Sequence, residues 1–139
     1  MDNLLPNTKL TRVASATAAG QTEIDGTALD MEGFASVAFI ASLPSVANTG
    51  VVRLTVQGRN TSSEGWTDLV SVTHTSTGAE TNRLLAVECP APMKKSVRCA
   101  LFRTVANSAI DCIVALQGRA TYLPVTQPAG VDTSTALPT

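Results

Sequence analysis

The sequence predicts an all-β domain, a sandwich of about eight strands, on three observations. Polar and apolar residues alternate with a period of two in a series of short runs. The runs are rich in β-branched residues, with 19 Thr and 14 Val among the 139 residues of the chain. Clusters of Gly, Pro, Asn and Ser separate them, and no long segment has apolar residues at a helical spacing.

The expected strands follow one another at intervals typical of a sandwich. They cover residues 10–19, 22–31, 34–42, 51–59, 66–74, 83–89, 96–103 and 110–119. In the fourth run the alternation places Val52, Leu54 and Val56 toward the core.

The last run is expected to point Ile110, Cys112, Val114 and Leu116 inward by the same alternation. The run 34–42, FASVAFIAS, is apolar on both faces. It is therefore either a central strand covered on both sides or a strand packed against another subunit.

The last two runs can form a hairpin about the turn TVAN. Such a hairpin would pair Leu101 with Ile110, Cys99 with Cys112 and Val97 with Val114, so that every inward residue faces another. We expect thiols rather than a disulfide, because adjacent cross-strand disulfides are strained and the compartment is expected to be reducing.

The two ends differ from the middle of the chain. Residues 120–139 contain three prolines and no alternation of useful length, and residues 1–9 contain Leu4 and Leu5 ahead of a proline. We therefore expect an N-terminal arm at 1–9, a sandwich domain at 10–119 and an extended C-terminal arm at 120–139.

Composition excludes several classes of function. A net charge of -1 offers no surface for nucleic-acid phosphates. No apolar run approaches the roughly 20 residues that span a bilayer, and the opening MDNLLPNTKL lacks the features of a signal peptide. We expect neither a nucleic-acid nor a membrane partner. With one histidine and three scattered cysteines we also expect no zinc site and no cofactor.

Nothing in the motifs predicts an enzyme. His74 is the single imidazole, and no GxSxG or similar elbow accompanies it. The carboxylates of residues 23–32 are expected to belong to a solvated turn, since nothing places two of them across a cleft and the calcium-loop pattern is absent.

Basic residues concentrate in the second half of the chain. Five of the six there are Arg83, Lys94, Lys95, Arg98 and Arg103. They are expected either to form one region that faces the acidic residues 23–32 of another copy, or to be ordinary solvated surface.

Trp66 follows a polar turn and begins the sequence WTDL. Anchoring in the core explains it most simply. The turn also resembles one in discoidin-like and other sandwich domains, some of which bind sugars, so Trp66 is the candidate glycan contact in an alternative interpretation.

Three stretches together resemble a known group. They are DMEGFASVAFIASL, VRLTVQGRNTSSEGWTDLV and SVRCALFRTVANSAIDCIVALQGRATYLPVTQ, which together cover roughly residues 30–127. They are similar to the small all-β virion structural proteins of tailed bacteriophages, some of which are proposed capsid decoration or cement proteins. The resemblance implies a sandwich of jelly-roll type, although the runs alone are also compatible with Greek-key and meander connections.

The resemblance implies a subunit, commonly a homotrimer, that is assembled in the host cytoplasm and binds the major capsid protein on the outside of the virion head. The expected contacts are arm anchors and two electrostatic residues. They are Leu4, Leu5, Tyr122, Leu123 and Pro124 in the arms, with Arg98 and Arg103. Two alternatives stay open: a carbohydrate-binding head-fibre or tail-associated module, and a structural component of the tail or connector.

Overall fold

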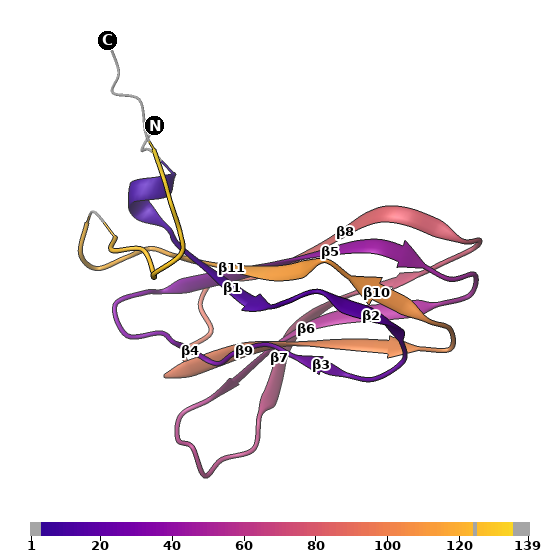
Figure 1. Ribbon diagram of the computed structural model, residues 1–139. Helices are drawn as coiled ribbons and strands as arrows, with labels where there is room; N and C mark the ends of the chain where they lie inside the picture. Colours follow the sequence, from indigo (N-terminus) through magenta and orange to yellow (C-terminus); the bar gives the residue numbers. More distant parts are fainter. Residues whose placement is uncertain (1–3, 124, 135–139) are drawn as a thin grey trace.

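The computed structural model describes residues 4–123 and 125–134, which form two stacked layers of antiparallel strands (Figure 1). A short 3₁₀ helix, η1 (Leu5–Asn7), precedes the strands. The strands are β1 (Lys9–Ala14), β2 (Thr17–Gly20), β3 (Ile24–Asp25), β4 (Leu29–Asp30), β5 (Ser36–Val46), β6 (Val51–Arg59), β7 (Thr67–Thr75), β8 (Glu80–Cys89), β9 (Ser96–Thr104), β10 (Ser108–Ile110) and β11 (Cys112–Gly118).

Strand pairing defines the topology. One sheet has the order β1-β11-β5-β10-β2 with β8 on the other side of β5, and the other has the order β3-β9-β6-β7 with β4 also on β9. Three strands of the sandwich are each interrupted and divided into two pieces, namely β1 and β2, β3 and β4, and β10 and β11. Both β3 and β4 pair with β9, and both β10 and β11 pair with β5. The pieces β1 and β2 pair with β11 and β10, respectively. With each pair taken as one strand, every connection crosses between the layers except that from β6 to β7, and this is the order of a jelly roll, as expected.

The core lies between the layers and consists of alternate residues from both sheets. Val52, Leu54 and Val56 are fully buried, so the inward face expected for β6 is confirmed. From β5 of the facing sheet, Phe39 and Leu43 are equally buried.

The inward face expected for the last run is correct at Ile110 and wrong beyond it. Cys112, Val114 and Leu116 are only partly buried, whereas Ile113 is fully buried. The reason is Asp111, which interrupts the strand and donates its backbone N–H to Ser42 O at 2.8 Å. One inserted residue moves every later side chain to the opposite face.

The expected hairpin of the last two runs is also wrong, because they belong to different sheets. Cys99 on β9 pairs with Val56, and Cys112 on β11 pairs with Ser42. The connection at residues 105–107 crosses between layers, as the jelly roll requires. All three cysteines are free, as expected, and burial raises the pKa of the Cys99 thiol to about 12, so it stays protonated at neutral pH.

The outer faces of the two sheets differ in character. On the β3-β9-β6-β7 sheet the outward residues are largely polar or charged, and the Arg53 guanidinium lies 4.4 Å from the centre of the Phe102 ring. On the other sheet, β5 points Ala38 and Ile40 outward between the buried Val37, Phe39 and Ala41. Because β5 is apolar on both sides, it contributes apolar side chains to the outer face of its sheet as well as to the core.

Arg103 connects the two layers at one end of the sandwich. It belongs to β9 and is only 2% exposed. Its guanidinium donates to the carbonyl oxygens of Ala18 (2.9 Å), Thr22 (2.8 Å) and Ser108 (2.6 Å), and to Thr22 Oγ1 (2.7 Å). Ala18 and Ser108 lie in the opposite sheet, and Thr22 lies in the crossover from β2 to β3. Burial lowers the pKa of Arg103, while the four acceptors compensate part of the cost of desolvation.

We expect Arg103→Met to lower the free energy of unfolding by about 3 kcal/mol, because it leaves several carbonyl acceptors without their donor. Chemical denaturation measures this loss. The matched control is Arg53→Met, which removes a guanidinium stacked on an aromatic ring on the outer face and should cost less than about 1 kcal/mol. Equal losses in the two variants would show that Arg103 does not hold the layers together.

Candidate binding surfaces

The two terminal segments lie against each other at one end of the sandwich (Figure 1). The N–H of Val125 donates to Pro6 O at 2.8 Å. The Gln127 amide accepts from Leu10 N at 2.9 Å and donates to Thr8 O at 2.7 Å and Leu5 O at 3.3 Å. One glutamine side chain therefore satisfies three backbone groups of the N-terminal segment and ties the C-terminal segment to it.

The terminal segments expose large apolar side chains. Leu4 is 66% exposed, Tyr122 83% and Leu123 60%, while Leu5 is partly buried. Val125 contacts Pro6, and Gln127 contacts Leu5, Thr8 and Leu10, so the segment that follows Leu123 lies against residues 5–10. Pro124, the remaining expected anchor, lies outside the described residues.

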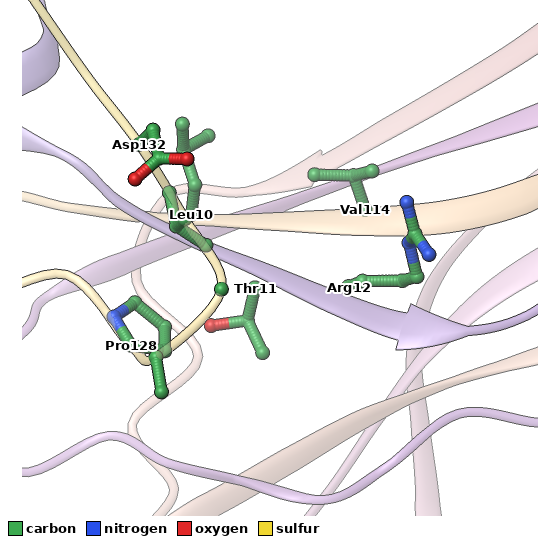
Figure 2. Close-up of a pocket in the computed structure, with 9 residues that line it drawn as sticks. Leu10, Thr11, Arg12, Val114, Pro128 and Asp132 are labelled. Carbon is green, nitrogen blue, oxygen red and sulfur yellow. The ribbon is translucent and has the colours of Figure 1, made fainter.

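A hollow of about 550 Å³ separates part of the C-terminal segment from the edge of the sheet. Figure 2 shows Leu10, Thr11 and Arg12 of β1 and Val114 of β11 on one side, with the segment 128–132 on the other. The hollow is open and mixed in polarity, so it is a groove between a strand and a terminal segment rather than an enclosed ligand site.

We expect Gln127→Ala to accelerate hydrogen exchange at the amides of Leu10 and Val125 by about tenfold or more, because three hydrogen bonds between the terminal segments are lost. Hydrogen–deuterium exchange monitored by mass spectrometry measures this change in rate directly. Gln21→Ala is the control, since Gln21 makes one exposed hydrogen bond to Asn107 at the other end of the sandwich. Unchanged exchange in Gln127→Ala would refute the role given to this side chain.

A second candidate surface lies around Trp66, on the outer face of the β3-β9-β6-β7 sheet. The guanidinium carbons of Arg59 and Arg98 lie 4.2 Å and 4.7 Å from the centre of its ring. Arg98 Nε donates to Gln57 Oε1 at 2.9 Å, and Gln57 Nε2 donates to Asp68 Oδ1 at 2.9 Å. Trp66 is therefore a partly covered surface residue with cation–π partners rather than a core anchor.

Acidic residues from β3 border this surface. Arg98 forms an ion pair with Asp25 at 3.6 Å, and Asp25 also shares a hydrogen bond with Glu23. That hydrogen bond, with a smaller contribution from desolvation, raises the pKa of Glu23. The acidic partner of Arg98 thus lies in its own chain, where the sequence suggested another copy.

The basic residues grouped by the sequence do not form one region. Arg83 pairs with Glu80 near the turn between β7 and β8, and Lys94 and Lys95 line hollows at the opposite end. Arg98 stacks on Trp66. Arg103 is buried, so its expected role as an electrostatic contact to a partner is corrected to an internal one. Charge pattern along a chain gives no information about which face of a strand each residue occupies.

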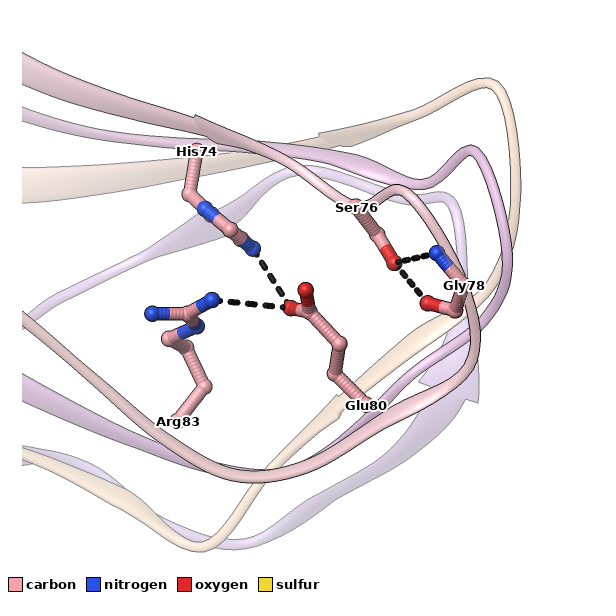
Figure 3. A network of polar contacts seen from close by, with 5 residues as sticks. All are labelled: His74, Ser76, Gly78, Glu80 and Arg83. Atoms are coloured by element: carbon pink, nitrogen blue, oxygen red, sulfur yellow. Dashed lines mark hydrogen bonds and ion pairs between the residues drawn. The ribbon is translucent and has the colours of Figure 1, made fainter.

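His74 belongs to a small polar cluster at the connection from β7 to β8, which crosses from one sheet to the other (Figure 3). Its Nε2 lies 2.5 Å from Glu80 Oε2, which also meets Arg83 at 3.2 Å, and Ser76 bonds with Gly78 in the turn. The hydrogen bond from His74, followed by the contact with Arg83, lowers the pKa of Glu80. The cluster joins β7 of one sheet to β8 of the other.

No group of three or more His, Cys, Asp or Glu side chains in residues 4–123 and 125–134 has the arrangement of a metal site. No helix in that same part of the chain has the length and apolar character needed to cross a membrane.

Comparison with known proteins identifies no family. No family model and no curated protein matches the chain. The chain is similar to a solved structure described as "CBM4 structure and function", with a TM-score of 0.47, 10% identity, and coverage of 83% of this chain and 90% of that one. It is also similar to "Structure of Eiger TNF from S. frugiperda", with a TM-score of 0.45, 9% identity, and coverage of 94% and 99%. The jelly roll described above follows from the strand pairing of this chain itself.

The sequence did not predict the roles of Gln127 and Arg59. Gln127 lies among prolines and small residues, and no pattern there predicts a hydrogen-bond partner. The residues that it contacts are more than a hundred positions away in the sequence. Arg59 offers a weak signal, because it ends a strand on the same face as Gln57, just before the turn that returns to Trp66.

Because Trp66 is the single tryptophan of the chain, its fluorescence reports on this surface. We expect Arg98→Ala to shift its emission to longer wavelength, since the ring loses one of its two covering groups and meets water. Arg12→Ala, on the other sheet, should leave the emission unchanged. Titration with oligosaccharides should also leave it unchanged; a saturable shift would instead favour the glycan-binding alternative.

Proposed function

We propose that the chain is a structural protein of a bacteriophage particle, of the decoration or cement type, that binds the outside of the head. One observation carries the proposal: the paired terminal segments present Leu4, Tyr122 and Leu123 to solvent at one end of the sandwich. The resemblance of three ordered sequence stretches to small virion proteins supports it. The resemblance also implies a homotrimer and the major capsid protein as partner.

The geometry suits a protein that binds by surfaces. Exposed apolar side chains on segments already ordered by backbone hydrogen bonds lose little conformational entropy when they enter a pocket or add to a sheet. Many identical weak contacts on a shell then give a combined affinity far above that of one contact. We accordingly propose no catalytic role and no cofactor for this chain.

Two alternatives differ from the decoration role, one in symmetry and the other in its contact surface. A tail or connector component would use the same terminal segments but in a ring of different symmetry. A carbohydrate-binding module would use Trp66, and sugar stacking there requires Arg59 or Arg98 to leave the ring. The terminal segments need no such rearrangement, which is why the decoration role is preferred to the carbohydrate-binding module.

Co-sedimentation with phage heads tests the proposal. The heads come from a phage deleted for the gene of this chain, and bound protein is measured against free concentration. We expect saturable binding of the wild type and about tenfold weaker binding or more for the double variant Tyr122→Ser/Leu123→Ser, which removes two exposed apolar anchors.

The matched control is Val105→Ser, which removes an equally exposed apolar side chain from the turn at the far end of the sandwich and should bind like the wild type. Absence of wild-type binding at saturating concentration would refute the decoration role. Binding that both variants retain in full would refute the terminal segments as the contact.

A further inference from the structure

The outer face of the sheet that contains β5 carries apolar residues across four adjacent strands. In register from β1 through β11 and β5 to β8, one row is Arg12, Val114, Ile40 and Ala86, and the next is Leu10, Leu116, Ala38 and Glu88. Six of these eight residues are apolar, and Leu84, 65% exposed, follows on β8.

This face is unusual for a sheet with one side in water. An antiparallel sheet that is solvated on one side normally alternates apolar inward with polar outward residues, and the other sheet of this molecule does so. Here Ile40 is 36% exposed although the residues on either side of it are fully buried. A continuous apolar surface across several strands indicates a surface that a partner covers.

The two charges on the face stand at its opposite margins. Arg12 lies on the outer strand β1, and Glu88 lies on the outer strand β8. Within the described residues neither side chain takes part in an ion pair. Asp132 lines the same hollow as Arg12 (Figure 2) but is not paired with it.

We propose that this face is a contact between two copies of the chain, related by a twofold axis that runs parallel to the strands between β11 and β5. Such an axis places β1 of one copy over β8 of the other, and β11 over β5. Val114 then packs against Ile40 of the second copy, and Arg12 comes to the margin that carries Glu88 of the second copy. This contact requires the segment 128–132, which stands across the hollow from Arg12 and Val114 in its own chain, to move away from the β1 margin. The positions of Arg12 and of Glu88 in the second copy differ by one row, which is about 7 Å along the strands. An arginine side chain can span this distance.

The pattern favours a second copy over an unrelated partner because the face is complementary to itself. In these two rows its middle strands carry only apolar residues, and its charges are opposite in sign on the two outer strands. A head-to-tail ring would join one edge to the other and leave the middle strands exposed. The face is roughly 19 Å wide for four strands, so the contact is small and we expect dissociation in the micromolar range.

Sedimentation equilibrium of the wild type and three variants tests the contact. The protein concentration runs from about 1 to 500 μM, a range set by the expected affinity. Wild type is expected to show a reversible monomer–dimer equilibrium, in place of the homotrimer that the resemblance implies. Arg12→Glu and Glu88→Arg are each expected to weaken dimerisation by about tenfold, since symmetry places two like-charge contacts in each variant dimer. The double variant Arg12→Glu/Glu88→Arg restores both ion pairs and should regain the wild-type constant within about threefold.

Ile40→Asp, at the centre of the apolar residues, should abolish the dimer while keeping a cooperative unfolding transition, because its side chain already faces outward. A wild-type mass of one copy throughout the range, or of three copies, would overturn the proposal. So would a double variant that associates no better than either single reversal.

Discussion

A buried arginine at one end of the sandwich sets how the two sheets meet. Arg103 is the largest fully buried side chain, and its guanidinium joins β9 of one sheet to β2 and β10 of the other and to the crossover between β2 and β3. The apolar interior supplies the driving force for stacking the layers, but apolar packing is not directional and tolerates sliding. Four directed hydrogen bonds from one rigid group define which strand ends come together, and with them the position of the crossover that makes the topology a jelly roll.

Arg103 and short turns close that end, and the described terminal segments lie at the opposite end of the sandwich. There Gln127 holds the two terminal segments together through backbone groups, so their apolar side chains point to solvent on an ordered support. The outer faces of the two sheets also differ from each other. One face is polar and internally paired around Trp66, whereas the other is apolar across its middle strands. The molecule therefore offers two surfaces for partners, a terminal one and a sheet face, and both suit repeated contacts in an assembly.

Sequence reasoning predicted much of the strand content because alternation and turn residues are local properties. The runs 51–59, 66–74 and 96–103 coincide with β6, β7 and β9 within one residue at each end. It failed where the fold depends on contacts between distant residues. One inserted residue, Asp111, reversed the inward face of β11, and no local pattern distinguishes such an insertion from continued alternation. The turn TVAN has the composition of a hairpin turn, yet it crosses between sheets. Arg103 alternates in phase with the buried Leu101, but its charge suggested the surface, because partners such as Ala18 and Thr22 lie about eighty residues away.

Cryo-electron microscopy of heads lacking this protein, reconstructed before and after addition of the purified chain, tests the central claim most directly. The account predicts added density on the outer surface that fits the sandwich, with the terminal segments of residues 4–10 and 121–134 against the shell. No added density at saturating protein would contradict the proposed role. Density in which only the opposite end of the sandwich, around residues 105–107, touches the shell would contradict the assignment of the terminal segments as the binding surface.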